Sequence, residues 1–381
     1  MCLFKSVTDC TPSAKISAAV NRSDFIKAMR FLFYSIIFLI ISLPNQAFSQ
    51  DNSNSYFNRK TITVYIGRSA GSGTDLIVRL FTKYWQTHIP GDPQIIVRNI
   101  PGGGGTRVWN YGYEVAKPDG LSIFFSPFSG PAFMVGAPGL RANFEEMPLV
   151  GGLRSPNLFL ANSNLNDPTN QDDEIIFGGQ NPTHHYDIVG RIALDLLGFN
   201  YRYIYGFNSA NDVLNALRRG EIDAMTIGVS LYRFTVEDLL VNQGTAFPMW
   251  HNPRISNNNA YIPDSSMSEI PAFEGFYFNK LGYYPSGNLY EIYKWLQPTI
   301  NTFGHAAFLP PETDSNLIRI LQESFIKTTE DDQYRQEELS LFSFNMPIIL
   351  PQEGRRIVSL MANPPEHVSL FLESYVNQPN Q

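Results

Sequence analysis

The 381-residue sequence predicts an α/β protein that contains two strand–loop–helix units. In the first unit, residues 61–126, short apolar runs at residues 62–66 and 95–97 are each followed by a glycine-bearing turn and then by apolar residues at helical spacing. A second unit, residues 153–245, repeats this order after the apolar run at residues 175–177. Strands that alternate with helices in this way predict parallel pairing, with helices packed on the faces of the sheet.

The two glycine-bearing turns of the first unit are the strongest functional signal in the chain. One turn covers residues 69–75, and the other, at residues 99–106, contains four consecutive glycines. Both turns would lie at the carboxyl ends of strands and at helix N-termini, where unpaired backbone N–H groups and the helix dipole favour anions. Glycine also lets the backbone approach a ligand closely. The turns therefore predict an anion site formed by backbone amides.

The rest of the first unit follows from local patterns. The sequence Lys-Pro-Asp-Gly at residues 117–120 predicts a turn before a third strand at residues 121–125. Residues 127–148 are rich in glycine and proline and predict a loop with at most one short helix. A pair of strands is expected around residues 149–153 and 158–161.

Capping signals set the helices of the second unit. A helix over residues 188–197 is expected to end at Gly198, and a second helix is expected to begin at Ser209, with Asp212 completing a capping box, and to end at Gly220. Further strands are expected at residues 201–205 and 221–227, then an irregular stretch at 252–285, and then helices at 289–296, 315–328, 331–341, 351–361 and 365–375.

Composition limits the classes of partner. The formal net charge is −7, and the sequence contains no Lys/Arg cluster of the kind that follows nucleic-acid phosphates. Hydrophobic residues make up 43% and charged residues 17%, which is a globular composition. We expect no nucleic-acid partner, and an anionic ligand would have to be held by local amides against a mildly repulsive overall field.

The N-terminal segment, residues 1–49, predicts an extension followed by an export signal. Residues 31–43 are apolar, follow Lys27 and Arg30, and are short for a membrane span, which fits a cleavable signal with cleavage near Ser49. An uncleaved anchor is the alternative, and translation from Met29 is a further hypothesis. The cysteines, Cys2 and Cys10, precede the apolar run at residues 31–43, so the mature, exported protein would contain none.

Enzyme and cofactor motifs are not matched. The glycine run lacks the spacing of a dinucleotide fingerprint and the Gly-Lys-Ser/Thr ending of a phosphate-binding loop. The Gly-Ser-Gly at residues 71–73 lacks the spacing of a nucleophile elbow. We therefore expect neither catalysis nor a cofactor, and an exported hydrolase-like enzyme is the weakest alternative.

Several segments together resemble the Bug family, the periplasmic receptors of tripartite tricarboxylate transporters. The matching segments are Gly71-Ser72-Gly73-Thr74-Asp75, Arg98-Asn99-Ile100-Pro101-Gly102-Gly103-Gly104-Gly105, Lys117-Pro118-Asp119-Gly120-Leu121-Ser122-Ile123, Phe177-Gly178-Gly179-Gln180-Asn181-Pro182-Thr183-His184, Tyr205-Gly206-Phe207 through Gly220-Glu221-Ile222-Asp223, and His305-Ala306-Ala307-Phe308-Leu309-Pro310-Pro311. The resemblance covers most of the chain after the export signal, and its matches are densest in the first unit.

The resemblance implies a two-lobed periplasmic-binding-protein (Venus-flytrap) fold, with a mixed sheet flanked by helices in each lobe. The first part of lobe 1 would consist of residues 58–152, and lobe 2 of residues 153–250. Residues 251–381 would return to lobe 1 and include the C-terminal helices. A small organic acid would bind between the lobes of a monomer and be delivered to membrane transporter subunits. A ligand sensor of the same fold that acts on a membrane signalling protein is the alternative.

The ligand-binding residues implied by the resemblance come from both lobes. They are Gly71, Ser72, Gly73, Thr74, Asp75, Gly102, Gly103, Gly104 and Gly105 of lobe 1, and Gln180, Thr183, His184 and Phe207 of lobe 2. Thr106 and Arg107, which follow the second turn, are further candidates for the site. The chain departs from the family pattern at Gly67-Arg68, at Ser72 and at Arg107, and residues 252–300 match poorly. These departures leave the identity of the ligand open, and Arg107 and Arg68 are each either a contact to a carboxylate or a solvated side chain.

Other polar and aromatic residues have structural interpretations. Adjacent histidines on a helix point about 100° apart, so His184 and His185 suit one metal ion poorly, and no metal site is expected. Asp75 is expected to organise its turn or cap a helix, and Asp223 to start a strand. Three tryptophans are expected to pack on apolar helical faces, namely Trp85, Trp109 and Trp295.

Overall fold

The structure, a computed structural model, describes residues 56–377 apart from residues 129, 164, 166–173, 256–260 and 301–302. The expected extension and signal peptide, residues 1–49, lie outside the described residues. Within the described part, no helix combines the length and apolar character needed to cross a membrane.

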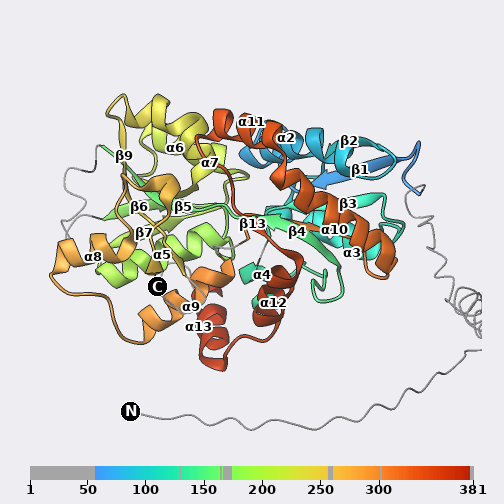
Figure 1. Ribbon diagram of the computed structural model, residues 1–381. Helices are drawn as coiled ribbons and strands as arrows, with labels where there is room; N and C mark the ends of the chain where they lie inside the picture. Colours follow the sequence, from blue (N-terminus) through green and yellow to red (C-terminus); the bar gives the residue numbers. More distant parts are fainter. Residues whose placement is uncertain are drawn as a thin grey trace, which may run out of the picture. The chain divides into compact units, whose positions relative to one another are not determined.

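Lobe 1 is built on a six-stranded mixed sheet with the order β13-β4-β12-β3-β1-β2 (Figure 1). β1 pairs in parallel with β2 and β3, as the strand–loop–helix pattern predicts, whereas β12 and β13 pair antiparallel with β4. The strands are β1 (Thr61–Ile66), β2 (Gln94–Asn99), β3 (Ser122–Ser126), β4 (Leu149–Leu153), β12 (His305–Phe308) and β13 (Ile348–Ile349). The helices are α2 (Gly73–His88), the 3-10 turn η2 (Gly103–Gly105), α3 (Thr106–Glu114), α4 (Gly130–Met134), α10 (Ser315–Glu330), α11 (Asp332–Phe342) and α12 (Pro351–Ala362).

Lobe 2 is built on a five-stranded mixed sheet with the order β7-β6-β8-β5-β9. β6 pairs in parallel with β7 and β8, and β5 pairs antiparallel with β8 and β9. The strands are β5 (Asn157–Asn162), β6 (Ile175–Gly178), β7 (Tyr201–Ile204), β8 (Ala224–Gly228) and β9 (Ala246–His251), beside a small ladder of β10 (Arg254–Ile255) and β11 (Tyr261–Ile262). The helices are α5 (His185–Leu197), α6 (Ala210–Arg219), α7 (Val229–Leu231) with the π-helix η3 (Tyr232–Val241) that continues it, η4 (Ser265–Met267), α8 (Phe273–Leu281), α9 (Asn288–Ile300) and α13 (Glu366–Asn377).

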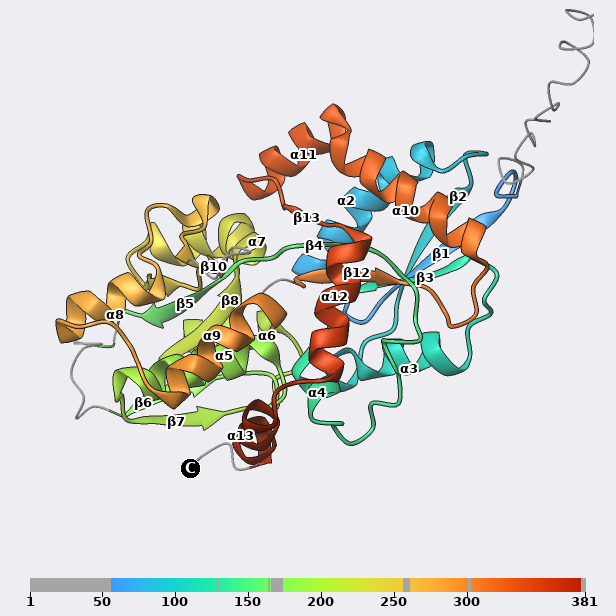
Figure 2. The same cartoon turned by 60° about the horizontal axis from the view of Figure 1, so that its bottom comes forward.

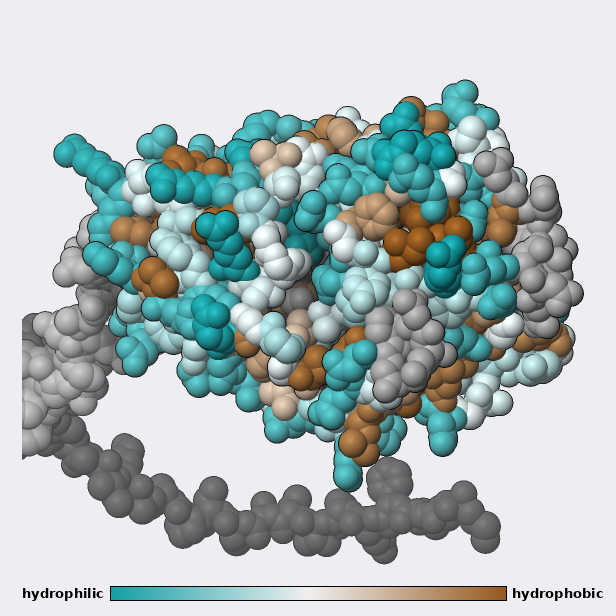
Figure 3. Space-filling model, turned by 180° about the vertical axis from the view of Figure 1, so that it is seen from behind, coloured by the Kyte–Doolittle hydropathy of each residue, from teal (hydrophilic) through white to brown (hydrophobic). Residues whose placement is uncertain are grey.

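Each sheet is covered by helices on both faces, which gives the described residues two apolar layers. One layer joins residues of α2 and α10 in lobe 1 to residues of α6 and η3 in lobe 2. The other joins residues of α3 and α12 to residues of α5, α9 and α13 (Figure 2). Trp85 and Trp109 are fully buried in these layers, and Trp295 packs against the second one, as their positions on apolar helical faces predict. The face seen in Figure 3 is mainly hydrophilic with separate apolar patches, since most large apolar side chains are used in the two layers.

The chain crosses between the lobes later than the family resemblance implies. Residues 261–300 lie with lobe 2, because α8 packs on β9 and α9 packs on α5 and β10, and α9 also contacts α4 and α12 of lobe 1, so the return to lobe 1 comes just before β12. The last helix, α13, also leaves lobe 1, since Arg191 of α5 donates from Nη2 to the carbonyl oxygen of Tyr375 at 3.1 Å. The expected irregular stretch at residues 252–285 contains α8, η4 and the small ladder.

The capping signals of the second unit are confirmed. The side chain of Ser209 accepts a hydrogen bond from the backbone N–H of Asp212 at 3.2 Å, which satisfies one of the free donors at the start of α6. Gly198 and Gly220 follow α5 and α6 with φ of 69° and 70°, the left-handed conformation that ends a helix.

The connection between β4 and β5, which contains Ser155, contacts the connection that leads into β12, which contains Gly304. A Cβ atom added to Gly304 would lie 2.1 Å from Cβ and 2.4 Å from the backbone N of Ser155. Only glycine lets these two connections pass at this distance. The two connections therefore fix the place where the lobes meet.

Candidate functional site

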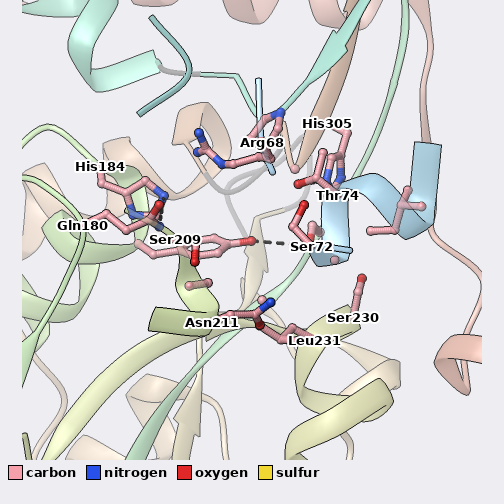
Figure 4. Close-up of a pocket in the computed structure, with 18 of the residues that line it drawn as sticks. Arg68, Ser72, Thr74, Gln180, His184, Ser209, Asn211, Ser230, Leu231 and His305 are labelled. Atoms are coloured by element: carbon pink, nitrogen blue, oxygen red, sulfur yellow. Dashed lines mark hydrogen bonds between the residues drawn. The ribbon is translucent and has the colours of Figure 1, made fainter. Parts of the chain in front are cut away.

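A cavity with about 650 Å³ of empty space, its open mouth included, lies between the two lobes. Lobe 1 contributes Arg68 and the start of α2, while lobe 2 contributes the starts of α5, α6 and α7 (Figure 4). Helix N-termini carry unpaired N–H groups and the positive end of the helix dipole. Their convergence makes the cavity a favourable place for an anionic group.

The local sequence explains why these helices begin at the cavity. α2 begins after Ser72, whose side chain accepts a hydrogen bond from the N–H of Asp75 at 3.3 Å. α6 begins after Ser209 in the same way, and α5 begins after His184, which makes no side-chain cap. Each helix follows a strand of its sheet, so the carboxyl ends of β1, β6 and β7 face the cavity from both lobes.

An aspartate occupies the first turn of α2, α5 and α6. Asp75 accepts hydrogen bonds from the N–H of Gly71 at 2.9 Å, from Nδ2 of Asn99 at 2.9 Å and from Nε of Arg79 at 3.0 Å. Burial opposes ionisation of Asp75, but the hydrogen bonds from Arg79, Gly71 and Asn99 outweigh it and lower the pKa of this carboxyl group. Asp75 therefore organises its turn and does not line the cavity, which agrees with the structural role expected for it.

The first-turn aspartates of lobe 2 have partners as well. Asp187 accepts from Oη of Tyr203 at 2.8 Å and from the N–H of Asn181 at 3.1 Å. Asp212 accepts from Oγ of Ser209 at 2.8 Å. Their negative charges offset part of the positive potential of the helix N-termini. The net charge at the cavity therefore depends on the cations that line it.

Arg68 is the only arginine or lysine, and no Asp or Glu is present, among the described residues that line this cavity. Its guanidinium donates from Nη1 to the backbone oxygen of Gly67 at 3.3 Å, and no carboxylate in the described part of the chain lies within 4.0 Å of it. Burial lowers the pKa of Arg68 to about 10, which leaves the side chain protonated at neutral pH. The cavity therefore contains a protonated cation without an acidic partner.

Two buried histidines beside Arg68 are neutral. Nε2 of His305 lies 3.2 Å from Oγ1 of Thr74, and burial together with the charge of Arg68 lowers the pKa of His305 to about 3. Burial, followed by the neighbouring His184 and Arg68, also lowers the pKa of His185 well below its ordinary value. Burial raises the pKa of the neighbouring Tyr186, whose hydroxyl donates to Oγ of Ser155 at 3.4 Å. Around neutral pH, Arg68 is therefore the charged side chain beside His185, Tyr186 and His305, which are uncharged.

Lobe 2 contributes a hydrogen-bonded chain to the cavity wall. Nδ1 of His184 lies 3.1 Å from Oδ1 of Asp187, and Nε2 of the same ring lies 3.0 Å from Nε2 of Gln180. All three side chains are buried. The chain holds the amide of Gln180 in place at the cavity.

The structure brings some of the sequence-predicted site residues together and separates others. Ser72, Gly73, Thr74, Gln180 and His184 line the cavity. Gly71, Asp75 and Thr183 support the adjoining turns through the contacts of Gly71 with Asp75 and of Thr183 with Asn181. Phe207 is partly buried against the apolar layer that contains α6.

The second glycine-bearing turn lies beside the cavity and does not line it. Gly103, Thr106 and the exposed Arg107 line a separate surface groove with residues of α3. Gly102 adjoins this groove, where an added Cβ would lie 3.6 Å from Cδ of Arg107. An added Cβ on Gly105, whose φ is 105°, would lie 3.3 Å from Nη1 of Arg68, so this turn packs behind the guanidinium.

Gly104 faces the other lobe. Its φ is 63°, and an added Cβ would lie 2.8 Å from Nδ2 of Asn181, which belongs to the loop between β6 and α5. The second turn of lobe 1 therefore meets lobe 2 directly, at the edge of the region where the lobes close on each other.

Sequence reasoning did not include several residues of the cavity wall in the site. They are Ser155, His185, Tyr186, Ser209, Asn211, Ser230, Leu231 and His305, whereas Arg68 had been left open between a carboxylate contact and a solvated side chain. The capping box at Ser209 was visible in the sequence, and a helix start after a strand is a signal for a site at the sheet edge. Ser155 and His305 come to the cavity only through the crossings between the lobes, for which the sequence carries no local signal. No group of His, Cys, Asp and Glu in the described part of the chain is arranged to hold a metal ion.

No family model and no curated protein matches the sequence. The chain nevertheless has the α/β fold of periplasmic binding proteins, with two mixed sheets flanked by helices and a cavity between them. This result confirms the fold class that the resemblance implies.

Three solved structures illustrate the likeness. BugD, a periplasmic binding protein, is 16% identical with a TM-score of 0.60, and the match covers 83% of this chain and 98% of BugD. MatC from Rhodopseudomonas palustris, with bound malate, is 16% identical with a TM-score of 0.58, and the match covers 83% of this chain and 99% of MatC. A second protein of that organism, with adipate, is 13% identical with a TM-score of 0.60, and the match covers 82% of this chain and 97% of that one. Likeness at such identities establishes a shared fold.

Proposed function

We propose that this protein is a periplasmic solute-binding receptor, without enzymatic activity, that captures a small organic anion carrying a carboxylate. The anion binds in the cavity between the lobes and is delivered to a membrane transporter of the tripartite tricarboxylate type. The observation that carries this proposal is Arg68, a partly buried cation in that cavity with no carboxylate partner among the described residues.

Electrostatics favour an anion over other solutes. A guanidinium without an acidic partner binds a carboxylate through a charge-assisted, two-pronged hydrogen bond. The starts of α2, α5 and α6 add backbone N–H donors from both lobes, so one anionic group can be contacted from both sides. An anion would therefore favour the closed arrangement of the lobes, because it interacts with both.

The cavity offers little to a cation. No Asp or Glu is present among the described residues that line it, so a ligand ammonium group would meet Arg68 and neutral side chains only. Burying an unpaired ammonium group is costly. We therefore expect organic acids to bind and amino acids and amines to bind weakly or not at all.

The fold supports this proposal. Structures with the same fold include proteins bound to malate and to adipate, both of which are small carboxylic acids. The resemblance of the turns at residues 69–75 and 99–106 to the receptors of tripartite tricarboxylate transporters suggests the same type of membrane partner here, and a periplasmic location.

A thermal-shift screen of the protein without residues 1–49 tests the proposal. The panel should contain mono-, di- and tricarboxylates, aromatic acids, amino acids, amines and neutral sugars. A ligand at about 100 times its Kd stabilises the folded state by about 2.7 kcal/mol, which corresponds to several degrees in Tm. Stabilisation by a few related acids supports a receptor. No response to any acid, or a response to amines alone, would contradict the proposal.

Delivery to a transporter needs a separate test. The membrane subunits encoded near this gene, reconstituted in vesicles, should take up the acid found in the screen only when this protein is added. Binding without uptake, together with a signalling protein encoded nearby, would favour the sensor.

A further inference from the structure

The helix α13 makes a third link between the lobes, in addition to the connections that contain Ser155 and Gly304. α12, which precedes it, packs on β4 and α4 of lobe 1 and also contacts α9, whereas α13 is bonded to α5 of lobe 2 (Figure 2). The two helices are joined by Asn363, Pro364 and Pro365. Three residues span at most about 11 Å, and each proline fixes its φ angle. The link is therefore short and stiff, and it cannot lengthen when one lobe moves relative to the other.

Tyr375 anchors α13 on lobe 2. Its ring centroid lies 4.1 Å from Cζ of Arg191, and its carbonyl oxygen accepts from Nη2 of Arg191 at 3.1 Å. Its hydroxyl donates to Oδ2 of Asp195, one turn further along α5, and lies 3.4 Å from the hydroxyl of Tyr201. The buried apolar residues of α13 are Val368, Leu372 and Val376. Among the described residues, the hydrogen bonds between α13 and lobe 2 therefore all involve Tyr375.

The docking of α13 leaves a buried charge partly unpaired. Arg191 is only 1% exposed, and its Nε and Nη1 atoms make no hydrogen bond to any described residue. A buried donor without an acceptor costs free energy, and release of α13 would let water reach the guanidinium on the side of Tyr375. The contacts of Tyr375 are thus opposed by the desolvation of Arg191, which makes the docking of α13 reversible.

α13 is docked in an arrangement in which the two lobes meet. Gly104 of lobe 1 lies against Asn181 of lobe 2, and the cavity is lined from both lobes. Arg191, which holds Tyr375, belongs to α5, and the first residues of α5, His185 and Tyr186, line that cavity. α13 therefore holds the helix with which lobe 2 approaches the ligand.

We propose that α13 is a strap that stabilises the closed arrangement of the lobes. It is fixed to lobe 1 through residues 363–365 and to lobe 2 through Tyr375. Because the link cannot lengthen, separation of the lobes requires Tyr375 to leave Arg191 and Asp195. A ligand that binds only the closed arrangement has an apparent Kd equal to its intrinsic Kd divided by the closed fraction, so the strap also raises affinity. The effect on affinity rests on the proposed function, whereas the effect on the lobes of the unliganded protein does not.

Lengthening the link tests the strap without changing either surface on which α13 docks. The variant carries Gly-Ser-Gly-Ser between Pro364 and Pro365. Spin labels at Val115→Cys in lobe 1 and Tyr283→Cys in lobe 2, both exposed positions, report the arrangement of the lobes by pulsed EPR in the protein without residues 1–49, which has no other cysteine. The unliganded variant should show a larger fraction of long distances than the protein without the insertion.

The matched control carries the same four residues after Gly244, in a turn inside lobe 2 with open space around it. This insertion should leave the label distances unchanged. Equal distance distributions in the two folded insertion variants would overturn the strap, and a shift toward shorter distances in the lengthened link would also overturn it.

Variants of the anchor give an independent test. Tyr375→Leu removes the ring beside Arg191 and the hydroxyl, so it should lengthen the label distances and weaken Kd for the tightest acid roughly 3- to 30-fold. Tyr375→Phe keeps the ring and should restore part of both effects. Leu370→Ala, at an exposed position of the same helix, should change neither.

The two readouts separate the possible failures. A loss of affinity in Tyr375→Leu without a change in the label distances would overturn the strap, because it would mean damage to the site alone. Wild-type protein that binds no acid would overturn the proposed function, and the label distances would still decide the role of α13. The insertion in the link remains decisive if Tyr375→Leu does not fold.

Discussion

Replacing Arg68 by methionine removes the charge that distinguishes the cavity and keeps most of the volume of the side chain. Two unit charges about 4 Å apart interact by about 4 kcal/mol at an effective dielectric constant of about 20. Part of this energy is offset by desolvation, and removing one partner of a hydrogen-bonded charge pair typically costs about 2–5 kcal/mol of binding free energy. For Arg68→Met we expect a loss of about 3 kcal/mol, or roughly 150-fold in Kd.

The folded protein without ligand should tolerate this change. Arg68 is partly buried and has no acidic partner in the described part of the chain, so its removal relieves a desolvated charge. The Tm of the unliganded variant should equal or exceed that of the wild type. Arg68→Lys keeps the charge but loses the planar fork, and we expect an intermediate loss of about tenfold.

Isothermal titration with the tightest acid from the screen measures these effects. Arg107→Met is the matched control, because Arg107 is exposed in a separate groove and should leave Kd unchanged. An affinity of Arg68→Met within about threefold of wild type, less than 1 kcal/mol, would refute the assignment of the anion to Arg68.

Three further predictions concern the packing of the two lobes. Burial raises the pKa of Glu274 from its ordinary value of 4.5 to about 7. Between these two pH values the folded state therefore binds more protons than the unfolded state, and the free energy of unfolding falls as pH rises. Glu274→Gln should therefore be more stable than wild type at pH 8, by up to about 3 kcal/mol, and equally stable near pH 4.5. Urea titrations at the two pH values that show no such difference would contradict the burial of this carboxyl group. Gly304→Ala should lower stability by about 1–3 kcal/mol because the added methyl group overlaps Ser155. The control Gly275→Ala, in α8 with open space around it, should raise stability by about 0.5–1 kcal/mol. Equal Tm values for the two variants would refute the close contact between Gly304 and Ser155. Gly104→Val should weaken ligand binding, because the added side chain meets Asn181 and because valine is strained at a positive φ. If the contact with Asn181 limits closure of the two lobes, the double variant Gly104→Val/Asn181→Ala should recover part of the affinity.

The sequence predicted the architecture well where local signals specify it. The parallel pairing of β1 with β2 and β3, the side-chain N-cap at Ser209 and the C-terminal caps at Gly198 and Gly220 all follow from spacing and residue type. These features depend on neighbours in the chain, so an amphipathic pattern or a capping residue carries enough information.

The points at which the chain crosses between lobes could not be read in this way. α8 and α9 pack on lobe 2 because their apolar faces meet β9 and α5, and an apolar helix face does not specify which sheet it covers. The docking of Tyr375 on Arg191 joins residues that are 184 positions apart. Only the tertiary arrangement determines these contacts.

The candidate site was predicted in part for the same reason. The turn at residues 69–75 and the loop that carries Gln180 and His184 reach the cavity because helix starts at the carboxyl ends of strands meet at one sheet edge. The four-glycine turn has the same local signal but lies behind Arg68 and against Asn181. For Arg68 the sequence left a carboxylate contact and a solvated side chain both open, since sequence does not show that a cation lines a cavity without an acidic partner.

A crystal structure of the protein with the tightest acid from the screen tests the central claim most directly. The account predicts the carboxylate within about 2.7–3.0 Å of the guanidinium nitrogens of Arg68, between the starts of α2 and α5. An acid bound elsewhere, for example in the groove at Arg107, or in the cavity with its carboxylate turned away from Arg68, would contradict the account.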